Sequence, residues 1–189
     1  FWHLALAFTY HMMVINATIT HIVPYLSSIG IGRSNSSLVA AGIPVLSIGG
    51  RIGLGWLADN MDRRLVAATS FAMMGLGLLC LGFVSTTDMW LLMPFVLLFG
   101  IGYGGGNALS PSLGREYFGS MNFGTIFGLL VGICGIGGIV GPTLAGWVYD
   151  NWGAYQRVWF LLAGLALVAV ISVLTISPAR NAVISGDKA

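Results

Sequence analysis

Long apolar stretches separated by short polar links follow one another along the whole chain. The hydrocarbon core of a bilayer takes roughly 20 residues of helix, and backbone polar groups inside it must bond to one another. Six stretches reach that length: Trp2 to about Leu26, Ser37 to Ala58, Leu65 to Val84, Met89 to Leu113, Phe123 to Tyr149 and Val158 to Ser177. The pattern predicts an all-α membrane protein. Residues 1–178 form its six-helix transmembrane bundle and residues 179–189 a polar tail.

The composition favours lipid around this bundle. Hydrophobic residues make up 57% of the chain and charged residues only 7%, which leaves too little polar surface for a water-soluble globule. The net charge is only +2 and no basic block is present, so we expect no nucleic-acid partner. The sequence contains no Gly-Lys-Ser/Thr phosphate loop and no cluster of metal ligands, so we expect no cofactor and no metal.

Charged residues gather between the second and third stretches, in the segment from Gly49 to Arg64. Because apolar helices flank this segment, we expect it to form a loop at a membrane surface. One side of the predicted bundle carries Arg63, Arg64, Arg115, Arg180 and Lys188, and the other side carries Arg33 and Arg157. Lys and Arg favour the cytoplasm. We therefore predict a multi-pass protein of the cell membrane, with the loops at 59–64 and 114–122 and the tail in the cytoplasm.

Glycines recur at every fourth position in several stretches. The pairs and triplets are Gly49 with Gly53, Gly100 with Gly104, Gly102 with Gly106, Gly137 with Gly141, and Gly124 with Gly128 and Gly132. Small residues at this interval let helix backbones approach closely in lipid, so we interpret most of them as packing seams. For Gly104-Gly105-Gly106 and Gly141-Pro142 we expect a loosened helix, buried in protein or lining a water-filled path. Pro24 should end the first helix, near Leu26.

The charged segment follows the pattern Gly-Arg-x-x-x-Gly-x-x-x-Asp-x-x-x-Arg-Arg, which Gly50, Arg51, Gly55, Asp59, Arg63 and Arg64 match. It resembles the signature of the cytoplasmic loop between helices 8 and 9 of major facilitator transporters. Three further sets of residues are similar to the monocarboxylate porter and oxalate:formate antiporter branch: 21–26; 102–106 with 117–119 and 122–124; and 141–150. The resemblance implies helices 7 to 12 of a twelve-helix protein, one half of a major facilitator fold, with an N-terminal six-helix half as its missing partner.

Arg51 is the candidate for binding the carboxylate of a substrate. It lies about seven residues, or roughly 10 Å, from the predicted loop. A guanidinium there should face protein, water or an anion, and its fork of donors suits a carboxylate. Alternatively, Arg51 extends to the inner surface or holds the loop. The resemblance implies that Asp59, Arg63 and Arg64 act as a gate, binding helix ends of the other half in one state only. The alternative is a plain topology signal.

Polar stripes on two helices suggest a water-filled path. On the first helix Thr9, Asn16 and Thr20 share one face, and Tyr10 and His21 share the face beside it. On the fourth, Tyr103, Asn107 and Ser110 form a comparable stripe. We therefore add Tyr10, Asn16, Tyr103 and Asn107 to the predicted substrate-binding residues. His21 is a candidate for proton coupling, with a structural role as the alternative. We expect His11 to be a hydrogen-bond partner between helices.

The function that this reading favours is secondary active transport of a small organic anion, monocarboxylate-like, by alternating access in a lipid bilayer. Another small solute is the first alternative. A membrane-embedded enzyme is the second, but all three histidines lie on the first helix and no nucleophile has an evident base. A third possibility is a half transporter that works as a homodimer. Because the chain opens at Phe1 rather than methionine, we expect a truncated start instead.

Overall fold

The computed structural model describes residues 1–85, 87–119 and 123–176, and these form a bundle of long helices. The helices are α1 (Trp2–Ser28), α2 (Arg33–Asn60), α3 (Arg63–Gly82), α4 (Leu92–Phe118), α5 (Phe123–Trp152) and α6 (Tyr155–Leu174), and the one-turn 3₁₀ helix η1 (Met89–Leu91) precedes α4. All six α-helices are long and apolar enough to cross a membrane. The predicted all-α class and the number of spans are confirmed. The tail at 179–189 lies outside the described residues.

The two loops predicted at 59–64 and 114–122 are shorter in the structure than the sequence predicted. The expected loop at 59–64 is wrong in extent, because α2 continues to Asn60 and only Met61 and Asp62 separate it from α3. The side chain of Asp62 accepts a hydrogen bond from the Arg64 backbone N–H, and this caps α3. The expected loop at 114–122 also begins late, because α4 continues to Phe118 and ends at Gly119, whose φ of +69° favours glycine. Residues 120–122 lie outside the described part.

Prolines do not end or break the helices as expected. Pro24 lies inside α1, which continues to Ser28, and Pro142 lies inside an uninterrupted α5. Neighbouring helices can support the backbone groups that a proline leaves free in a membrane bundle. The prediction that Gly141-Pro142 loosens its helix is therefore wrong.

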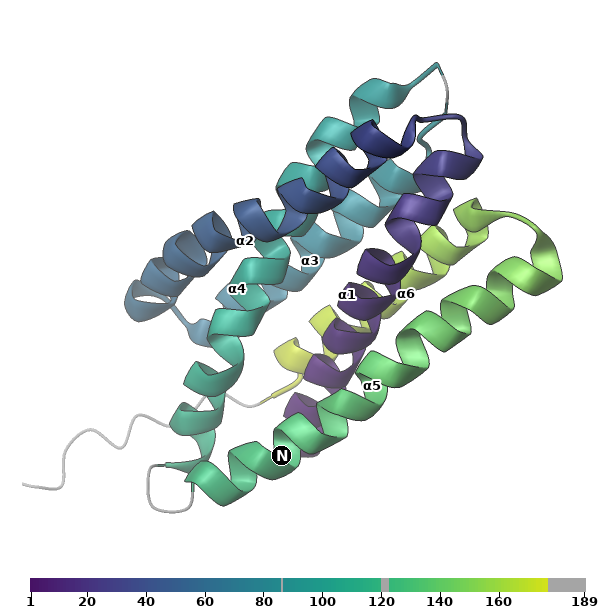
Figure 1. Cartoon of the computed structure of the whole chain (residues 1–189). Helices are drawn as coiled ribbons and strands as arrows, with labels where there is room; N and C mark the ends of the chain where they lie inside the picture. Colours follow the sequence, from purple (N-terminus) through teal and green to yellow (C-terminus); the bar gives the residue numbers. More distant parts are fainter. Residues whose placement is uncertain (86, 120–122, 177–189) are drawn as a thin grey trace, which may run out of the picture.

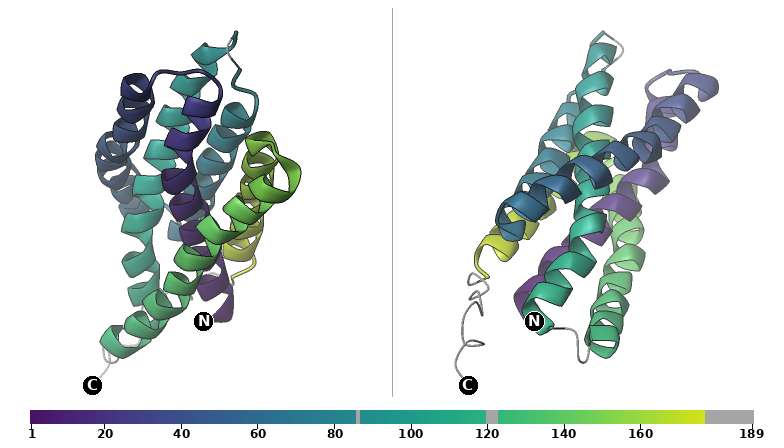
Figure 2. Two further views of the ribbon diagram at one scale, coloured as in Figure 1. Left: turned by 45° about the vertical axis from the view of Figure 1, so that its right-hand side comes forward. Right: turned by 90° about the vertical axis from the view of Figure 1, so that its left-hand side faces the viewer.

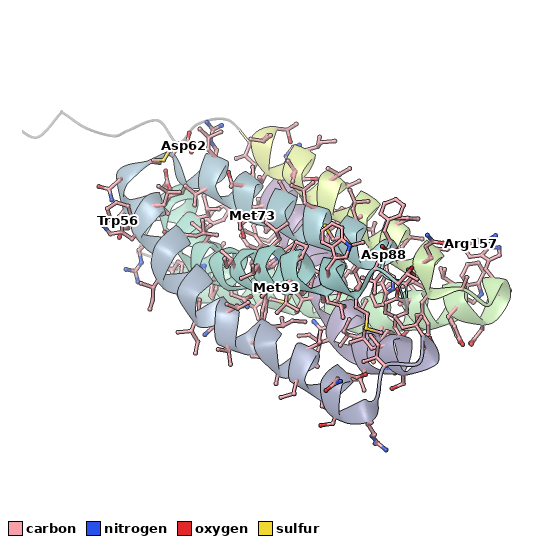
Figure 3. The ribbon with its side chains drawn as sticks, turned by 90° about the horizontal axis from the view of Figure 1, so that it is seen from above. Trp56, Asp62, Met73, Asp88, Met93 and Arg157 are labelled. Carbon is pink, nitrogen blue, oxygen red and sulfur yellow. The ribbon has the colours of Figure 1, made fainter. Side chains whose placement is uncertain are left out.

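Two groups of helices build the bundle. The helix α4 packs against α2 and α3, and α1 packs against α5 and α6, while α3 and α6 join the two groups (Figure 1). Figure 2 shows the first residue and the visible end of α6 toward the same end of the molecule, as an even number of crossings requires. Seen from above, Asp62 and Arg157 lie at opposite ends of the bundle (Figure 3).

Glycines bring helix backbones into contact between α3 and α4, where a Cβ on Gly102 would overlap the Ser70 carbonyl oxygen, and at two further crossings. Between α2 and α4, a Cβ on Gly50 would overlap the Ile101 carbonyl oxygen, and a Cβ on Gly104 would overlap that of Ser47. Between α1 and α5, Gly141 contacts the backbone of Met13 in the same way. No side chain longer than hydrogen fits between backbones this close. Gly104-Gly105-Gly106 is thus a contact segment inside a continuous α4, and the prediction that it loosens the helix is wrong.

Other glycines with the same spacing have no neighbouring helix against them among the described residues. A Cβ on Gly124, Gly128 or Gly132 of α5, or on Gly49 or Gly53 of α2, would have open space around it within 4 Å. The prediction of packing seams at these positions is wrong for contacts within the described residues. The same two helices are the least covered. Only 17% of the most apolar window of α2 and of α5 is buried, against 61% in α3.

Candidate functional site

Arg51 lies deeper in the bundle than the sequence indicated. Because α2 continues to Asn60, Arg51 stands nine residues from the helix end, or about 14 Å at 1.5 Å per residue. Its neighbour Gly50 packs against Ile101, near the middle of α4. The Arg51 side chain is exposed and has no hydrogen bond or ion pair to any described residue. An unpaired guanidinium at mid-depth is costly in lipid, so it needs water, protein or an anion beside it.

Tyr103 and Asn107 lie one turn apart on α4 and face the gap between α1 and α2. On either side of them around the helix are Gly106, which contacts His11 of α1, and Gly104, which contacts Ser47 of α2. Both Tyr103 and Asn107 are half-buried. Arg51 lies within about one helical turn of Tyr103 in depth, because its helix crosses α4 there.

Asn16 lies on α1, at a depth close to that of Arg51 and Tyr103. Its Nδ2 donates to the Met12 carbonyl oxygen at 3.0 Å, and its amide lies beside Gly138 of α5. Successive crossings alternate in direction, so α1 and α4 are antiparallel. Asn16 is five residues, or about 7 Å, beyond the His11 contact with Gly106, which places it near the level of Ile101 on α4. Asn16, Arg51 and Tyr103 therefore lie within about one helical turn of one another in depth and Asn107 one turn beyond Tyr103, but the Asn16 amide faces α5.

Tyr10 and His21 lie on a different flank of α1. The Nε2 atom of His21 is 3.1 Å from the Pro142 carbonyl oxygen of α5, and its ring centroid is 6.0 Å from that of Tyr155 of α6. Tyr10 is three turns away on the same flank and packs against the apolar core. The structure does not bring these two residues together with Arg51. The His21 ring therefore bridges α1 and α5. No acidic side chain among the described residues forms a hydrogen bond with it.

His11 is buried where α1, α3 and α4 meet. The side chain is 2% exposed, and neither ring nitrogen has a hydrogen-bond partner among the described residues. The ring packs against Phe71 at 4.9 Å and Phe8 at 5.9 Å between centroids, with Asn107 beside it. The Asn107 side chain of α4 nevertheless lies close enough to interact with the ring, so the predicted role of His11 as a partner between helices stays a prediction. His11 fills the space that Gly106 leaves at the contact of α1, α3 and α4.

Of the three predicted gate residues near the turn between α2 and α3, Arg63 and Arg64 have partners within this chain and Asp59 has none among the described residues. The Nη1 atom of Arg63 is 3.5 Å from Oε2 of Glu116 on α4, and the Nη2 atom of Arg64 is 2.7 Å from Oδ2 of Asp62. Arg64 also donates to the Ile176 carbonyl, just beyond α6. Asp59 is exposed and makes no ion pair or hydrogen bond to the described residues. Glu116 was not among the predicted site residues. Glu116 lies 53 residues after Arg63, and nothing in the sequence pattern marked the two as partners.

The turn before α3 is stabilised by charge and by capping. The Arg64 guanidinium beside Asp62 holds the pKa of that carboxyl below its ordinary value of 3.8. A lowered pKa means stability that is complete above pH 3.8 and is lost as the pH falls through the lowered value. Asp62 therefore stays ionised throughout the physiological range.

We predict that Asp62→Ala destabilises the protein by about 1 kcal/mol, because it removes the cap of α3. Asp62→Asn should cost less, since asparagine caps equally well and an exposed ion pair contributes about 0 to 1 kcal/mol. Thermal unfolding in detergent at pH 7 checks both variants. An equal loss in the two variants would mean that the ion pair, rather than the cap, stabilises the turn.

No metal centre is evident among residues 1–85, 87–119 and 123–176, where no three His, Cys, Asp or Glu side chains group closely enough to hold an ion. Cys80 and Cys134 are both free thiols. The arrangement is thus a polar face with a mid-depth arginine, rather than a constellation for covalent catalysis.

Comparison with known proteins was made for sequence and for fold. A family model described as Major Facilitator Superfamily matches residues 4–189. The mouse monocarboxylate transporter 12 is 30% identical over 152 residues, which cover 78% of this chain and 31% of that protein. The human monocarboxylate transporter 7 is 27% identical over 153 residues, covering 79% of this chain and 29% of that protein. These relatives are named as transporters, in agreement with the prediction that the chain is not an enzyme.

A solved structure, that of the E. coli fucose:proton symporter, superposes with a TM-score of 0.76 at 16% identity. The match covers 91% of this chain and 41% of the symporter chain. The predicted fold, one half of a major facilitator fold, is confirmed. The chain spans about a third of the length of the curated relatives that it matches.

Proposed function

Because the chain belongs to the Major Facilitator Superfamily and is a multi-pass membrane protein, we propose that it carries a small organic anion of the monocarboxylate class across the cell membrane. Residues 1–178 act as the C-terminal six-helix half of a longer transporter that works by alternating access. The observation that supports this most directly is Arg51, a mid-depth guanidinium with no partner among the described residues. The printed names of the monocarboxylate transporter relatives support the same substrate class.

Arg51 binds the substrate carboxylate through its fork of donors. Asn16, Tyr103 and Asn107 line the path at nearby depths and contact the rest of the substrate. Tyr10 contributes from the neighbouring flank of α1, through packing against the core rather than direct contact. His21 takes part in proton coupling, for which its bridge to the Pro142 carbonyl provides the link to α5.

The missing N-terminal half covers the open faces of α2 and α5. Their exposed glycines leave room for close helix contacts, and both helices are the least buried of the six. Asp59, which is unpaired among the described residues, is available to bind a helix end of that half. Arg63 and Arg64 complete the gate by holding the turn against α4 and α6. The gate and the tail at 179–189 face the cytoplasm, in accord with the Lys and Arg bias.

Reconstitution tests the proposed function. We expect the full-length protein in vesicles to accumulate a labelled monocarboxylate without altering it chemically, and unlabelled monocarboxylates to compete in a panel of solutes. A neutral sugar of similar size is the matched control and should not compete. If the sugar is accumulated and the carboxylate is not, the protein is a major facilitator transporter of another small solute.

A further inference from the structure

A basic cavity of about 340 Å³ lies at the inner end of the bundle, where α3, α4 and α5 meet. Its lining residues are Arg63, Ala108, Pro111, Ser112, Arg115 and Phe123. The lining thus combines two guanidinium groups and one hydroxyl with apolar side chains, and no carboxylate lines it. A volume of this size is in the range of small-molecule sites, roughly 300–1,000 Å³.

The cavity carries excess positive charge. Glu116 is the single acid that pairs with either arginine among the described residues, and its distance of 3.5 Å to Arg63 is long for an ion pair. The Arg115 guanidinium lies over the Phe123 ring at 5.4 Å from the centroid. Stacking occupies the face of a guanidinium and leaves the N–H donors at its edge available. Arg115 is therefore held in place with donors still free for an oxyanion.

A ridge of α4 connects the cavity with the polar face described above. Tyr103, Asn107, Pro111 and Arg115 follow one another at intervals of four along α4 and form a ridge that winds about 120° around the helix. Arg115 is twelve residues, or about 18 Å, from Tyr103 toward the inner end. An anion that leaves the level of Arg51 along this ridge meets Arg115 and Arg63 next.

We propose that this cavity is a second binding station for the transported organic anion, at the cytoplasmic mouth of its path. The inference rests on the proposed transport of a carboxylate. Arg115 and Arg63 bind the carboxylate, the Ser112 hydroxyl donates a further hydrogen bond, and Pro111 and Phe123 contact the carbon skeleton. An acidic lipid headgroup offers the same oxyanion chemistry, so the test separates the two sources.

Thiol protection in the full-length transporter tests the station. Ser112→Cys places a thiol in the cavity, and Thr175→Cys places a control thiol at the exposed inner end beyond α6. A membrane-impermeant thiol reagent is added to inside-out vesicles of phosphatidylcholine, with and without a monocarboxylate that the protein transports. We expect the substrate to slow labelling of the introduced thiol in Ser112→Cys and to leave that in Thr175→Cys unchanged.

A second substitution separates binding from a change of conformation. Adding Arg115→Gln should weaken protection so that about tenfold more substrate is needed, as expected for loss of a charge-assisted pair. Adding Arg33→Gln, at the outer end, should have no effect. Protection that survives Arg115→Gln overturns the station, because it reports a movement of the helices. Protection by phosphatidylglycerol in the vesicles, without substrate, also overturns it in favour of a headgroup. If the substrate is transported but does not slow labelling in Ser112→Cys, the second station is overturned alone. If the substrate is neither transported nor slows labelling, the proposed function is overturned as well.

Discussion

Replacing Arg51 by lysine should raise the substrate concentration for half-maximal carboxylate transport about tenfold or more. Arginine presents two parallel N–H donors to a carboxylate, whereas lysine presents a point charge, and hydrogen bonds to charged groups contribute about 1.5–3 kcal/mol. Arg51 is the side chain for which this matters most, because it stands at mid-depth with no other partner among the described residues. Concentration dependence of labelled monocarboxylate uptake into vesicles measures the effect.

Arg33→Lys is the matched control for this prediction. Arg33 is an exposed arginine at the other end of the same helix, so its replacement should leave uptake unchanged. Folded protein should be recovered in equal amounts for the two variants, since Arg51 makes no contact that stabilises the described bundle. Normal half-saturation in Arg51→Lys would rule out the carboxylate role and leave Arg51 as a residue that extends to the inner surface.

Replacing Gly104 by leucine should abolish folding of the bundle, and Gly104→Ala should already lower the melting temperature markedly. The atom that a Cβ at this position would overlap is the backbone oxygen of Ser47, which has no rotamer to move out of the way. The helices α2 and α4 would have to separate, and overpacking of this kind costs about 1–3 kcal/mol or more. Yield of monodisperse protein and thermal unfolding in detergent check the result.

Gly164→Ala tests whether the effect comes from the contact or from glycine itself. A Cβ on Gly164 of α6 meets open space, so alanine should leave stability unchanged or raise it by up to about 1 kcal/mol through its helix propensity. We therefore expect Gly104→Ala to lower the stability of the protein and Gly164→Ala to leave it unchanged or raise it. A similar loss in both would show that the α2–α4 contact at Gly104 is not what stabilises the bundle.

The sequence predicted the helices well because their signal is local. A run of apolar residues that is long enough to cross a bilayer is visible without knowing any neighbour. The ends were less accurate, because α2 extends past the apolar run through Asp59 and Asn60. Polar residues are compatible with a helix once it leaves the hydrocarbon, so hydropathy underestimates helix length at a membrane surface. The depth of Arg51 was underestimated for the same reason.

Contacts between helices were harder to predict than the helices. Gly124 and Gly128 have the same spacing as Gly100 and Gly104, yet only the second pair meets a neighbouring helix in this chain. Spacing shows that a close approach is possible and does not identify the partner. The cavity beside Arg115 was missed because residues 114–122 were interpreted as a loop. In the structure α4 continues through Arg115, which extends the ridge of Tyr103 and Asn107 to the inner end.

Two of the glycine crossings limit how this bundle can move. At each of them main-chain atoms touch, at Ser47 with Gly104 and at Met13 with Gly141, and main-chain atoms cannot yield by changing rotamer. Sliding α2 along α4 would need Gly104 to leave Ser47, and sliding α1 along α5 would need Gly141 to leave Met13. The helices α2 and α4 should therefore tilt as one rigid pair, with Arg51 and Arg115 at a constant separation. The conformational change that the proposed alternating access requires must then occur outside this pair of helices.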